Sequence, residues 1–348
     1  MARDSDPAKP PRTRRRAGRA TMSDVAKLAG VSAITVSRLL RESDTVSAEL
    51  AARIRDAIDR LGYVPNLMAG GLAAAKSRIV GVVVPSIRNA FFAATVDALA
   101  AKLDARGLAV LDSSSDYDLD REDKLIETML AWNPAALVLT GFVHGPRTAA
   151  ILARASLPVV EMWDVAGRPF DMAVGFDHHA AGRRAARHLL SRGCRRVGVI
   201  GAILGKDTRA AARCAGVRDE LDRAGLVPAA WTDLPRASNV GDGAESFAAM
   251  LGTPGGIDAV AFSNDVLALG ALFECRRRGV RVPDDVALIG FGDLDFAAHC
   301  LPSLTTMRPP RETIGNETAR MLSARLDGAS PEPRVVDLGC ELIVRESA

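Results

Sequence analysis

Short apolar runs alternate with amphipathic stretches along most of this 348-residue chain, from Ile79 onward. Five runs have the length and apolar content of buried strands: IVGVVVP, LAVLDSS, AALVLTG, PVVEMWD and MAVGFD. They alternate with helical patterns at 93–106 and 121–132. A second set, RVGVIGA, AVAFSND and VALIGFGD, comes with helical patterns at 213–224, 265–278 and 311–326. Because strands that alternate with helices form parallel sheets, the two sets predict two doubly wound α/β lobes. Ligands bind beyond the carboxyl ends of such strands, so the lobes predict a cleft for a ligand.

The residues before this body have a helical pattern instead. The run from Thr21 to Asp24 fits a capping box that opens a short helix, and Gly30 can take the left-handed conformation that ends it. The predicted apolar face of this helix consists of Val25, Leu28 and Ala29. Ser32 is predicted to cap a second helix at 33–40. Two short helices joined by a tight turn with a glycine form a helix-turn-helix.

A third helical pattern completes the unit that we predict for residues 21–64. Ser47 is predicted to cap it and Gly62 to end it. Its apolar residues repeat at helical spacing: Leu50, Ile54, Ile58 and Leu61. The periodicity predicts a three-helix bundle but does not by itself show DNA binding.

The residues on the outer side of the second helix suit contact with a DNA groove: Ser32, Ala33, Ile34, Ser37 and Arg38. The Arg38 guanidinium can donate two hydrogen bonds to guanine or hold a phosphate. The hydroxyls of Thr35 and Ser37 suit contacts with the DNA backbone. The alternative interpretation is a solvated helix face.

The run VAKLAGVSAITVSRLL and the following VSAELAARIRDAIDRLGYVPN resemble the DNA-binding head of the LacI/GalR (lactose/galactose repressor) family, over residues 21–76. The resemblance implies that Ala33, Ile34 and Arg38 are the main base-reading residues. Since Ala33 and Ile34 are apolar, we expect them to contact thymine methyl groups or to read the shape of the duplex. Thr21 and Asn66 are further predicted DNA contacts.

In that family the segment matching LMAGGLAAAKS folds into a hinge helix on the operator and inserts a leucine into the minor groove. The matching residue is Leu72, with Met68 in the contact between the two hinges. An inserted leucine unstacks a base step and bends the duplex. Gly70 and Gly71 disfavour a helix, so we predict a hinge at 65–78 that is disordered without DNA and a Gly70→Ala variant that binds the operator more tightly. A flexible linker is the compatible alternative.

The charge of the chain is concentrated at its N-terminal end. Residues 1–78 contain fifteen Lys and Arg against eight Asp and Glu, whereas the remainder contains thirty against thirty-four. A basic head on a mildly acidic body predicts a polyanionic partner. Residues 1–20 have little to bury, and we interpret them as a disordered basic arm.

The cysteines and the apolar runs indicate the compartment. The five cysteines are widely spaced and form no C-x-x-C, which argues against a zinc site or a disulfide framework. No stretch approaches the ~18 consecutive apolar residues of a membrane span. No apolar segment follows the arginine-rich N-terminus, which argues against a secretory signal. We therefore expect a cytoplasmic protein with no membrane partner.

Several residues lie where the predicted strands of the body end. Ser86 follows the first strand, Phe92 lies early in the next helix, Asn264 ends AVAFSND, and Asp293 follows VALIGFG. Arg209 and Arg213 are one helical turn apart, close to a predicted helix N-terminus, and could clamp a carboxylate or phosphate. For Arg209 a solvated basic face is the rival interpretation.

Residues 79–345, within a predicted body at 79–348, resemble the ligand domain of the same family, which has a periplasmic-binding-protein-like fold. The fragments AVGFD, FSNDVLALGALFECRRRGVRVPDDVALIGFGD, MRPPRETIG and VVDLG are similar to its gluconate-utilisation repressor branch. The resemblance implies that Arg213 clamps the effector and that Asn264 lines the pocket. Gly292, beside Asp293, stands where the family has an Asp that binds sugar hydroxyls. This departure and the two arginines favour an anion such as gluconate or 6-phosphogluconate over a neutral sugar.

The motifs of enzymes are missing from the sequence. No G-x-G-x-x-G follows the first strand, and no P-loop or G-x-S-x-G occurs, so we expect no cofactor and no catalytic residues. The five histidines lack metal-ligand spacing, which favours structural roles for them and no metal. A solute-binding protein of transport and a sugar-acid enzyme are rival interpretations, and neither explains residues 21–76.

Together these features predict a repressor of a carbohydrate or sugar-acid operon, controlled by a small effector. Two identical heads would read a palindromic operator. No Leu-heptad tail of the kind found in the tetramers of the family is present, so we expect a homodimer. The sequence does not decide whether the effector is an inducer, which the gluconate branch implies, or a corepressor.

Overall fold

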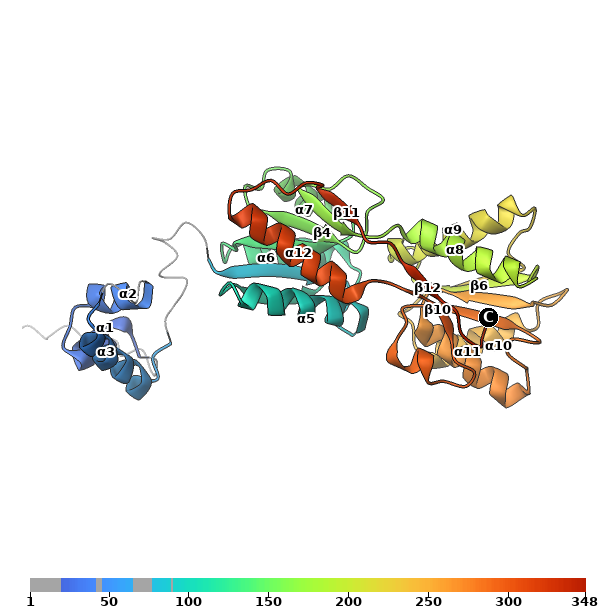
Figure 1. Cartoon of the computed structure of the whole chain (residues 1–348), viewed down its shortest axis with the longest axis horizontal. Helices are drawn as coiled ribbons and strands as arrows, with labels where there is room; N and C mark the ends of the chain where they lie inside the picture. The colour runs from blue at the N-terminus through green and yellow to red at the C-terminus, as the bar shows by residue number, and fades with distance from the viewer. Residues whose placement is uncertain (1–19, 42–45, 65–76, 89) are drawn as a thin grey trace, which may run out of the picture. The chain divides into compact units, whose positions relative to one another are not determined.

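The computed structural model describes residues 20–41, 46–64, 77–88 and 90–348, and the chain divides into two compact units, Met1–Ser77 and Arg78–Ala348. The predicted basic arm, apart from its last residue, and most of the predicted hinge lie outside the described residues. Figure 1 traces both units along the chain.

The described residues of the first unit form three helices: α1 Met22–Ala29, α2 Ala33–Arg41 and α3 Ala48–Leu61. The predicted capping box is confirmed, because the Thr21 hydroxyl accepts from the Asp24 N–H while the Asp24 carboxylate accepts from the Thr21 N–H. Gly30 ends α1 in the left-handed conformation at φ 67°. Val25, Val36 and Ile54, one from each helix, are completely buried and form the centre of a small core.

Two details of the predicted helices are wrong. Leu28 is 42% exposed, and Ala26 lies in the core instead, since the small helices meet closely enough for an alanine to fill the contact. The Ser47 side chain makes no capping hydrogen bond to α3. The burial of Ala26 depends on how the helices pack against one another, which spacing along the chain does not contain.

The second unit begins with a lobe built on a six-stranded sheet in the order β11-β5-β4-β3-β1-β2. All of its strand pairs are parallel. The strands are β1 Ile79–Val84, β2 Ala109–Ser114, β3 Ala136–Thr140, β4 Val159–Met162, β5 Met172–Gly175 and β11 Val335–Asp337. Its helices are α5 Ala90–Asp104, α6 Leu119–Leu130, α7 Pro146–Leu152 and α12 Arg311–Leu326.

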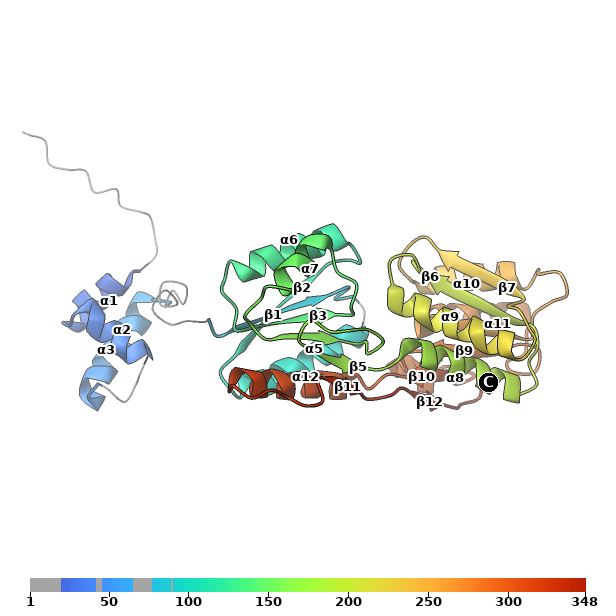
Figure 2. The same ribbon diagram turned by 90° about the horizontal axis from the view of Figure 1, so that it is seen from above.

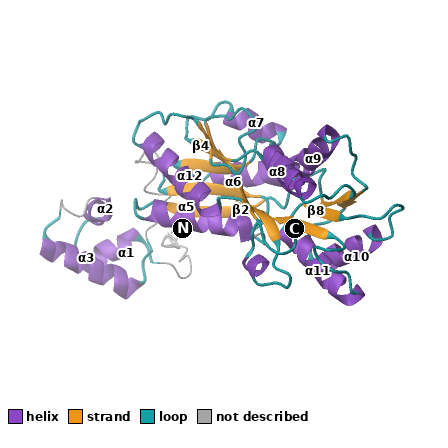
Figure 3. Ribbon diagram, turned by 45° about the vertical axis from the view of Figure 1, so that its right-hand side comes forward, coloured by secondary structure: helices purple, strands orange, loops and turns teal. Residues whose placement is uncertain are grey.

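The other lobe has a six-stranded sheet in the order β12-β10-β9-β8-β6-β7, in which only β12 is antiparallel to its neighbour. The strands are β6 Val197–Ala202, β7 Ala230–Leu234, β8 Ala259–Phe262, β9 Ala287–Phe291, β10 Thr305–Arg308 and β12 Glu341–Ile343. The helices are α8 His178–Ser191, α9 Thr208–Arg223, α10 Val240–Met250, α11 Asp265–Arg278 and the short η2 Asp295–Ala298. Helices cover both sheets, as Figure 3 shows.

The predicted pair of α/β lobes is confirmed, but the place of one helix differs. The sequence grouped residues 311–326 with the second set of strands, whereas α12 packs on α5 in the first lobe (Figure 2). Gly315 permits the contact, because a Cβ there would lie 2.3 Å from the Thr95 carbonyl oxygen. The chain therefore crosses between the lobes three times, after β5, after β10 and after β11. An amphipathic pattern does not indicate which of two sheets a helix covers.

Candidate functional site

The outer face of α2 carries most of the predicted DNA contacts. Ile34 is 72% exposed and Arg38 is also exposed. Ala33, Thr35 and Ser37 are half-buried beside them. Because Val36 and Leu39 lie in the core of the head, the opposite face of α2 is left for a partner.

The hydroxyl groups at the N-termini of α1 and α2 make local hydrogen bonds. The Thr35 N–H donates to the Ser32 hydroxyl at 3.2 Å, so Ser32 caps α2 as predicted. The Thr21 hydroxyl donates to the Asp24 carboxylate at 2.6 Å, and this hydrogen bond lowers the pKa of Asp24. The remaining predicted contacts, Asn66 and Leu72, lie outside the described residues, as do Met68 and Gly70.

A cleft of about 530 Å³ separates the carboxyl ends of the strands in the two lobes of the second unit. Its lining includes five of the six predicted effector contacts: Ser86, Phe92, Arg209, Arg213 and Asn264. It also includes Trp163 after β4, His178 at the start of α8, and Ser263 after β8. The cleft has the size of a typical small-molecule site.

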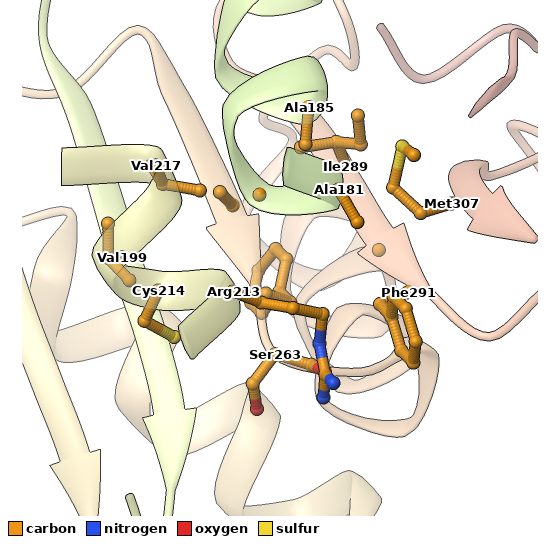
Figure 4. A pocket seen from close by; sticks show the side chains of 14 residues that line it. Ala181, Ala185, Val199, Arg213, Cys214, Val217, Ser263, Ile289, Phe291 and Met307 are labelled. Atoms are coloured by element: carbon orange, nitrogen blue, oxygen red, sulfur yellow. The ribbon is translucent and has the colours of Figure 1, made fainter. Parts of the chain in front are cut away.

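Arg213 is held from two sides in the floor of this cleft. Its Nη1 donates to His178 Nδ1 at 2.9 Å, and its Nη2 donates to the Ser263 carbonyl oxygen at 3.0 Å. The guanidinium carbon lies 3.7 Å from the centre of the Phe291 ring, an arrangement visible in Figure 4. Burial lowers the pKa of Arg213. The position of the guanidinium is therefore set before any ligand arrives.

His178 is 2% exposed and contacts both lobes. Its Nε2 lies 2.6 Å from the Trp163 carbonyl oxygen in the first lobe, and its Nδ1 faces Arg213 in the second. Burial, together with the charges of Arg213 and Arg209, holds the pKa of His178 well below its usual value. A neutral ring that accepts at Nδ1 carries its proton on Nε2 and donates to Trp163.

Two helices carry these residues, and they meet through glycines. A Cβ at Gly182 of α8 would lie 1.9 Å from the Arg213 carbonyl oxygen, and one at Gly216 of α9 would lie 2.1 Å from the His179 carbonyl oxygen. Since only glycines allow the two backbones to approach so closely, they set the distance between His178 and Arg213.

Arg209 extends from α9 toward the first lobe. Its Nη1 lies 3.4 Å from the Thr140 carbonyl oxygen at the end of β3, and its guanidinium carbon is 5.9 Å from the centre of the Phe92 ring. It pairs with Asp207 at 3.6 Å. With 7% exposure it does not belong to a solvated basic face, so that interpretation of Arg209 is wrong.

Asn264 and Asp293 have other partners. The Asn264 side-chain oxygen caps α11 by accepting from the Leu267 N–H at 3.2 Å, and its Nδ2 donates to the Ser238 hydroxyl at 2.7 Å. Asp293 is not part of the cleft lining, because its carboxylate accepts hydrogen bonds from Arg308 and from Arg345. The structure therefore does not support the predicted effector contact at Asp293.

Three buried polar atoms of cleft residues have no hydrogen-bond partner among the described residues: Trp163 Nε1, Arg213 Nε and Ser263 Oγ. Buried polar atoms are normally paired, so each such atom requires an explanation. Sequence reasoning missed Trp163, His178 and Ser263 as site residues. Trp163 and Ser263 directly follow strands, and the rule that ligands bind at carboxyl ends of strands could have found them.

The helix-turn-helix unit and the two-lobed body define the class of DNA-binding regulator with a ligand cleft. Residues 21–66 match the bacterial regulatory proteins of the lacI family, and residues 186–348 match the periplasmic binding protein-like domain. The HTH-type transcriptional regulator GntR of Pseudomonas aeruginosa is 42% identical over 334 residues, covering 96% of this chain and 97% of that protein. GntR of Escherichia coli is 37% identical over 324 residues, covering 93% and 97%.

Solved structures of transcriptional regulators have a similar fold. The fold is similar to that of a LacI-family transcriptional regulator from Silicibacter pomeroyi, with a TM-score of 0.90 and 32% identity over 94% of this chain and 99% of that chain. It is also similar to GntR from Chromobacterium violaceum, with a TM-score of 0.74 and 39% identity over 77% and 98%. The chain belongs to the LacI family. It is a DNA-binding transcriptional repressor, and the prediction that it is not an enzyme is confirmed.

Membrane-spanning helices and metal-binding clusters are both absent from the described residues. No described helix is long and apolar enough to span a bilayer. Within the same residues, no three His, Cys, Asp or Glu side chains are grouped so that they could hold a metal ion.

Proposed function

We propose that this repressor controls a sugar-acid catabolic operon and that its effector is an anion, gluconate or 6-phosphogluconate, bound in the cleft. The observation that carries the proposal is the pair of buried arginines one turn apart on α9, Arg209 and Arg213. Asp207 is the one aspartate near them in the described lining, and it lies 3.6 Å from Arg209. Similarity to regulators named GntR supports the same class of effector.

The other charged residues of the described lining balance each other. Arg88 and Asp116 lie 3.5 Å apart with largely exposed side chains. Within the inner lining the two arginines therefore outnumber the one aspartate, although Asp164, outside the lining, also acts electrostatically on Arg209 and reduces the excess of positive charge. A carboxylate or phosphate would neutralise this charge and accept hydrogen bonds from guanidinium groups, which are stronger than those between neutral groups. Trp163 Nε1 and Ser263 Oγ could bind effector hydroxyls.

At the other end of the chain, the proposed DNA-binding domain is residues 21–64. Ala33, Ile34 and Arg38 would contact bases, and Thr21, Ser32, Thr35 and Ser37 would contact the DNA backbone. By the family resemblance, Asn66 and Leu72 would add contacts from the hinge. Two chains in a homodimer would place two heads on a palindromic operator about one helical turn apart.

Effector and operator binding would be coupled through movement of the lobes. Closing of two-lobed domains around ligands is a common switching motion. Couplings of this kind typically amount to about 1–3 kcal/mol. A neutral sugar is the alternative effector and lacks a group to pair with the inner charge.

A thermal-shift series on the full chain tests the proposal, with gluconate, 6-phosphogluconate and glucose as ligands. A ligand at 100 times its Kd adds about 2.7 kcal/mol of stability, which is readily measured. We expect one of the two acids to stabilise the chain and to change its affinity for a palindromic operator. Stabilisation by glucose alone would refute the anionic effector.

Substitution in the head tests the DNA-binding proposal. Arg38→Ala should weaken binding to the operator by about 1–3 kcal/mol if Arg38 reads a base. Lys27, in the last turn of α1, provides a control substitution to Ala outside the proposed contact residues. Equal binding of operator and random duplex by the unaltered chain would refute sequence-specific recognition.

A further inference from the structure

We propose that His178 is a positioning residue that links the effector arginine to the first lobe, so that occupation of the cleft alters how the lobes are held together. The inference rests on the proposed function, because it requires an effector at Arg213. It adds the residue through which the effector would act on the arrangement of the lobes.

His178 lies where such a link must pass. It is the first residue of α8, directly after the chain has crossed from β5 of the first lobe. Asp177 fixes the helix start by accepting from the Ala180 N–H at 2.9 Å. Each ring nitrogen of His178 is then bonded to a different lobe, with Trp163 on one side and Arg213 on the other. The imidazole is therefore a bridge of two hydrogen bonds between the lobes.

The bridge has a fixed direction. A guanidinium can only donate, so Nδ1 must accept from Arg213 and Nε2 must carry the proton that goes to the Trp163 carbonyl oxygen. The charged groups that act on the ring are Arg213 and Arg209, and both favour its neutral form. Hydrogen bonds in series polarise one another, so an anion that offsets the charge of Arg213 alters the strength of the Nε2–H bond.

The far end of the bridge is a strained residue. Trp163 has φ 73°, a left-handed conformation that bulky side chains rarely adopt and that surrounding contacts must hold. Its N–H donates to the Val174 carbonyl oxygen at 2.8 Å, and its ring lies 5.2 Å from that of Phe92. The hydrogen bond from His178 is the further contact that holds its carbonyl. Weakening this bond would favour release of the strain.

Arg213 has donors to spare for an effector. Its Nε has no partner among the described residues, although the side chain is buried. A guanidinium carries five N–H donors, and the bonds to His178 and Ser263 use two of them, so a carboxylate that pairs with the remaining donors would compensate the charge without displacing His178. The altered polarity then passes along the bridge to Trp163. The effector would thus act on the first lobe through a residue that it does not need to touch.

The test uses the full chain with His178→Asn, since asparagine keeps an acceptor near the place of Nδ1 but cannot reach the Trp163 carbonyl. His179→Asn is the matched control, because the neighbouring ring is half-exposed and contacts Asp219 at 2.8 Å. Without ligand, amide hydrogen exchange should become faster at 163–170 in His178→Asn and stay unchanged in His179→Asn. Unchanged exchange in both variants would overturn the link.

The second measurement uses gluconate as the probe. In the unaltered chain gluconate should change operator affinity by about 5–150-fold, the usual range of allosteric coupling. In His178→Asn this ratio should fall toward one, while gluconate binding weakens far less than in Arg213→Ala. The proposal would be overturned if gluconate changed the operator affinity of His178→Asn as much as that of the unaltered chain. It would also be overturned if His178→Asn lost gluconate binding as completely as Arg213→Ala. If gluconate does not bind to the unaltered chain, gluconate is refuted as the effector. The hydrogen-exchange measurement without ligand then still tests the role of His178.

If His178→Asn does not fold, an NMR spectrum of the unaltered chain still tests the proposal. Nitrogen-15 NMR of the imidazole should show a neutral ring with its proton on Nε2 at pH 7. A ring protonated on Nδ1 or on both nitrogens would overturn the bridge.

Discussion

The Phe91 ring occupies the space that a side chain at Gly292 would need: a Cβ there would lie 2.2 Å from Phe91 Cε1. Phe91 belongs to α5 in the first lobe and Gly292 follows β9 in the second, so this contact joins the lobes. The Phe91 and Phe291 rings meet edge to face, with centroids 5.9 Å apart. An aromatic ring therefore lies where the family resemblance would place an acidic side chain.

Gly292→Ala should lower the free energy of unfolding by about 1–3 kcal/mol, the cost of a strained backbone conformation. Its φ of 134° is one that side-chain-bearing residues rarely adopt, and the Phe91 ring adds a steric cost. Urea denaturation followed by circular dichroism measures the change. Gly205→Ala is the control, because no atom lies within 4 Å of a Cβ built there. An equal loss in both variants would contradict the role of Phe91.

Arg213→Ala should abolish the response to gluconate while operator affinity stays close to that of the unaltered chain. Arg213→Lys should also fail, because an ammonium group lacks the planar set of donors that fits a carboxylate and the face of Phe291. Calorimetry with gluconate and a gel-shift assay measure the two affinities. Arg218→Ala serves as the control, since Arg218 lies on the same helix with a 58% exposed side chain. Loss of both gluconate binding and operator binding in Arg213→Ala would indicate that Arg213 has a purely structural role.

His144 should make the stability of the body depend on pH. Its ring is 1% exposed and lies 2.7 Å from Glu122 and 3.2 Å from Glu161. Burial alone lowers the pKa of His144, but the hydrogen bonds and charges of the two glutamates outweigh it and raise the pKa to about 9. A histidine in an unfolded chain has a pKa of about 6.5, so between these values the folded chain holds a proton that the unfolded chain does not. This contribution is complete below about pH 6.5 and is lost as the pH rises through about 9.

Denaturation at pH 6, 7.5 and 9 checks this dependence. His144→Gln should be less stable than the unaltered chain at pH 6, and the difference should shrink toward pH 9. His299→Gln, at an exposed position, should leave the dependence unchanged. A difference that stays constant with pH would show that His144 acts by packing alone.

The N-cap residues of α1 and α3, Thr21 and Ser47, allow a matched pair of substitutions. Thr21→Ala should destabilise the head by about 1 kcal/mol, because it removes a capping hydrogen bond from α1. Ser47→Ala should have a smaller effect, since Ser47 makes no such bond to α3. Hydrogen exchange of α1 and α3 amides in the full chain measures both. Equal effects would mean that the Thr21 cap is not formed in solution.

The sequence by itself determined the elements of this protein and the order in which they occur. The capping box at Thr21 and the left-handed turn at Gly30 depend on atoms within a few residues of one another, so their spacing predicts them. The apolar runs of the body predict buried strands for the same reason. Arg209 and Arg213 are predicted from their spacing of one helical turn, which is also local, and the family resemblance implies that Arg213 clamps the effector.

Only the tertiary structure decided which side chains meet. His178 bonds Trp163 and Arg213, fifteen and thirty-five residues away, and this depends on the crossing between the lobes after β5 and on Gly182 and Gly216. Asp293 follows a strand as predicted but lies against Arg345, fifty-two residues later. The periodicity of apolar residues and the capping residues of helices reflect interactions within a single turn, helix or strand. The cleft depends on how separate elements pack, and that free energy is not contained in any local pattern.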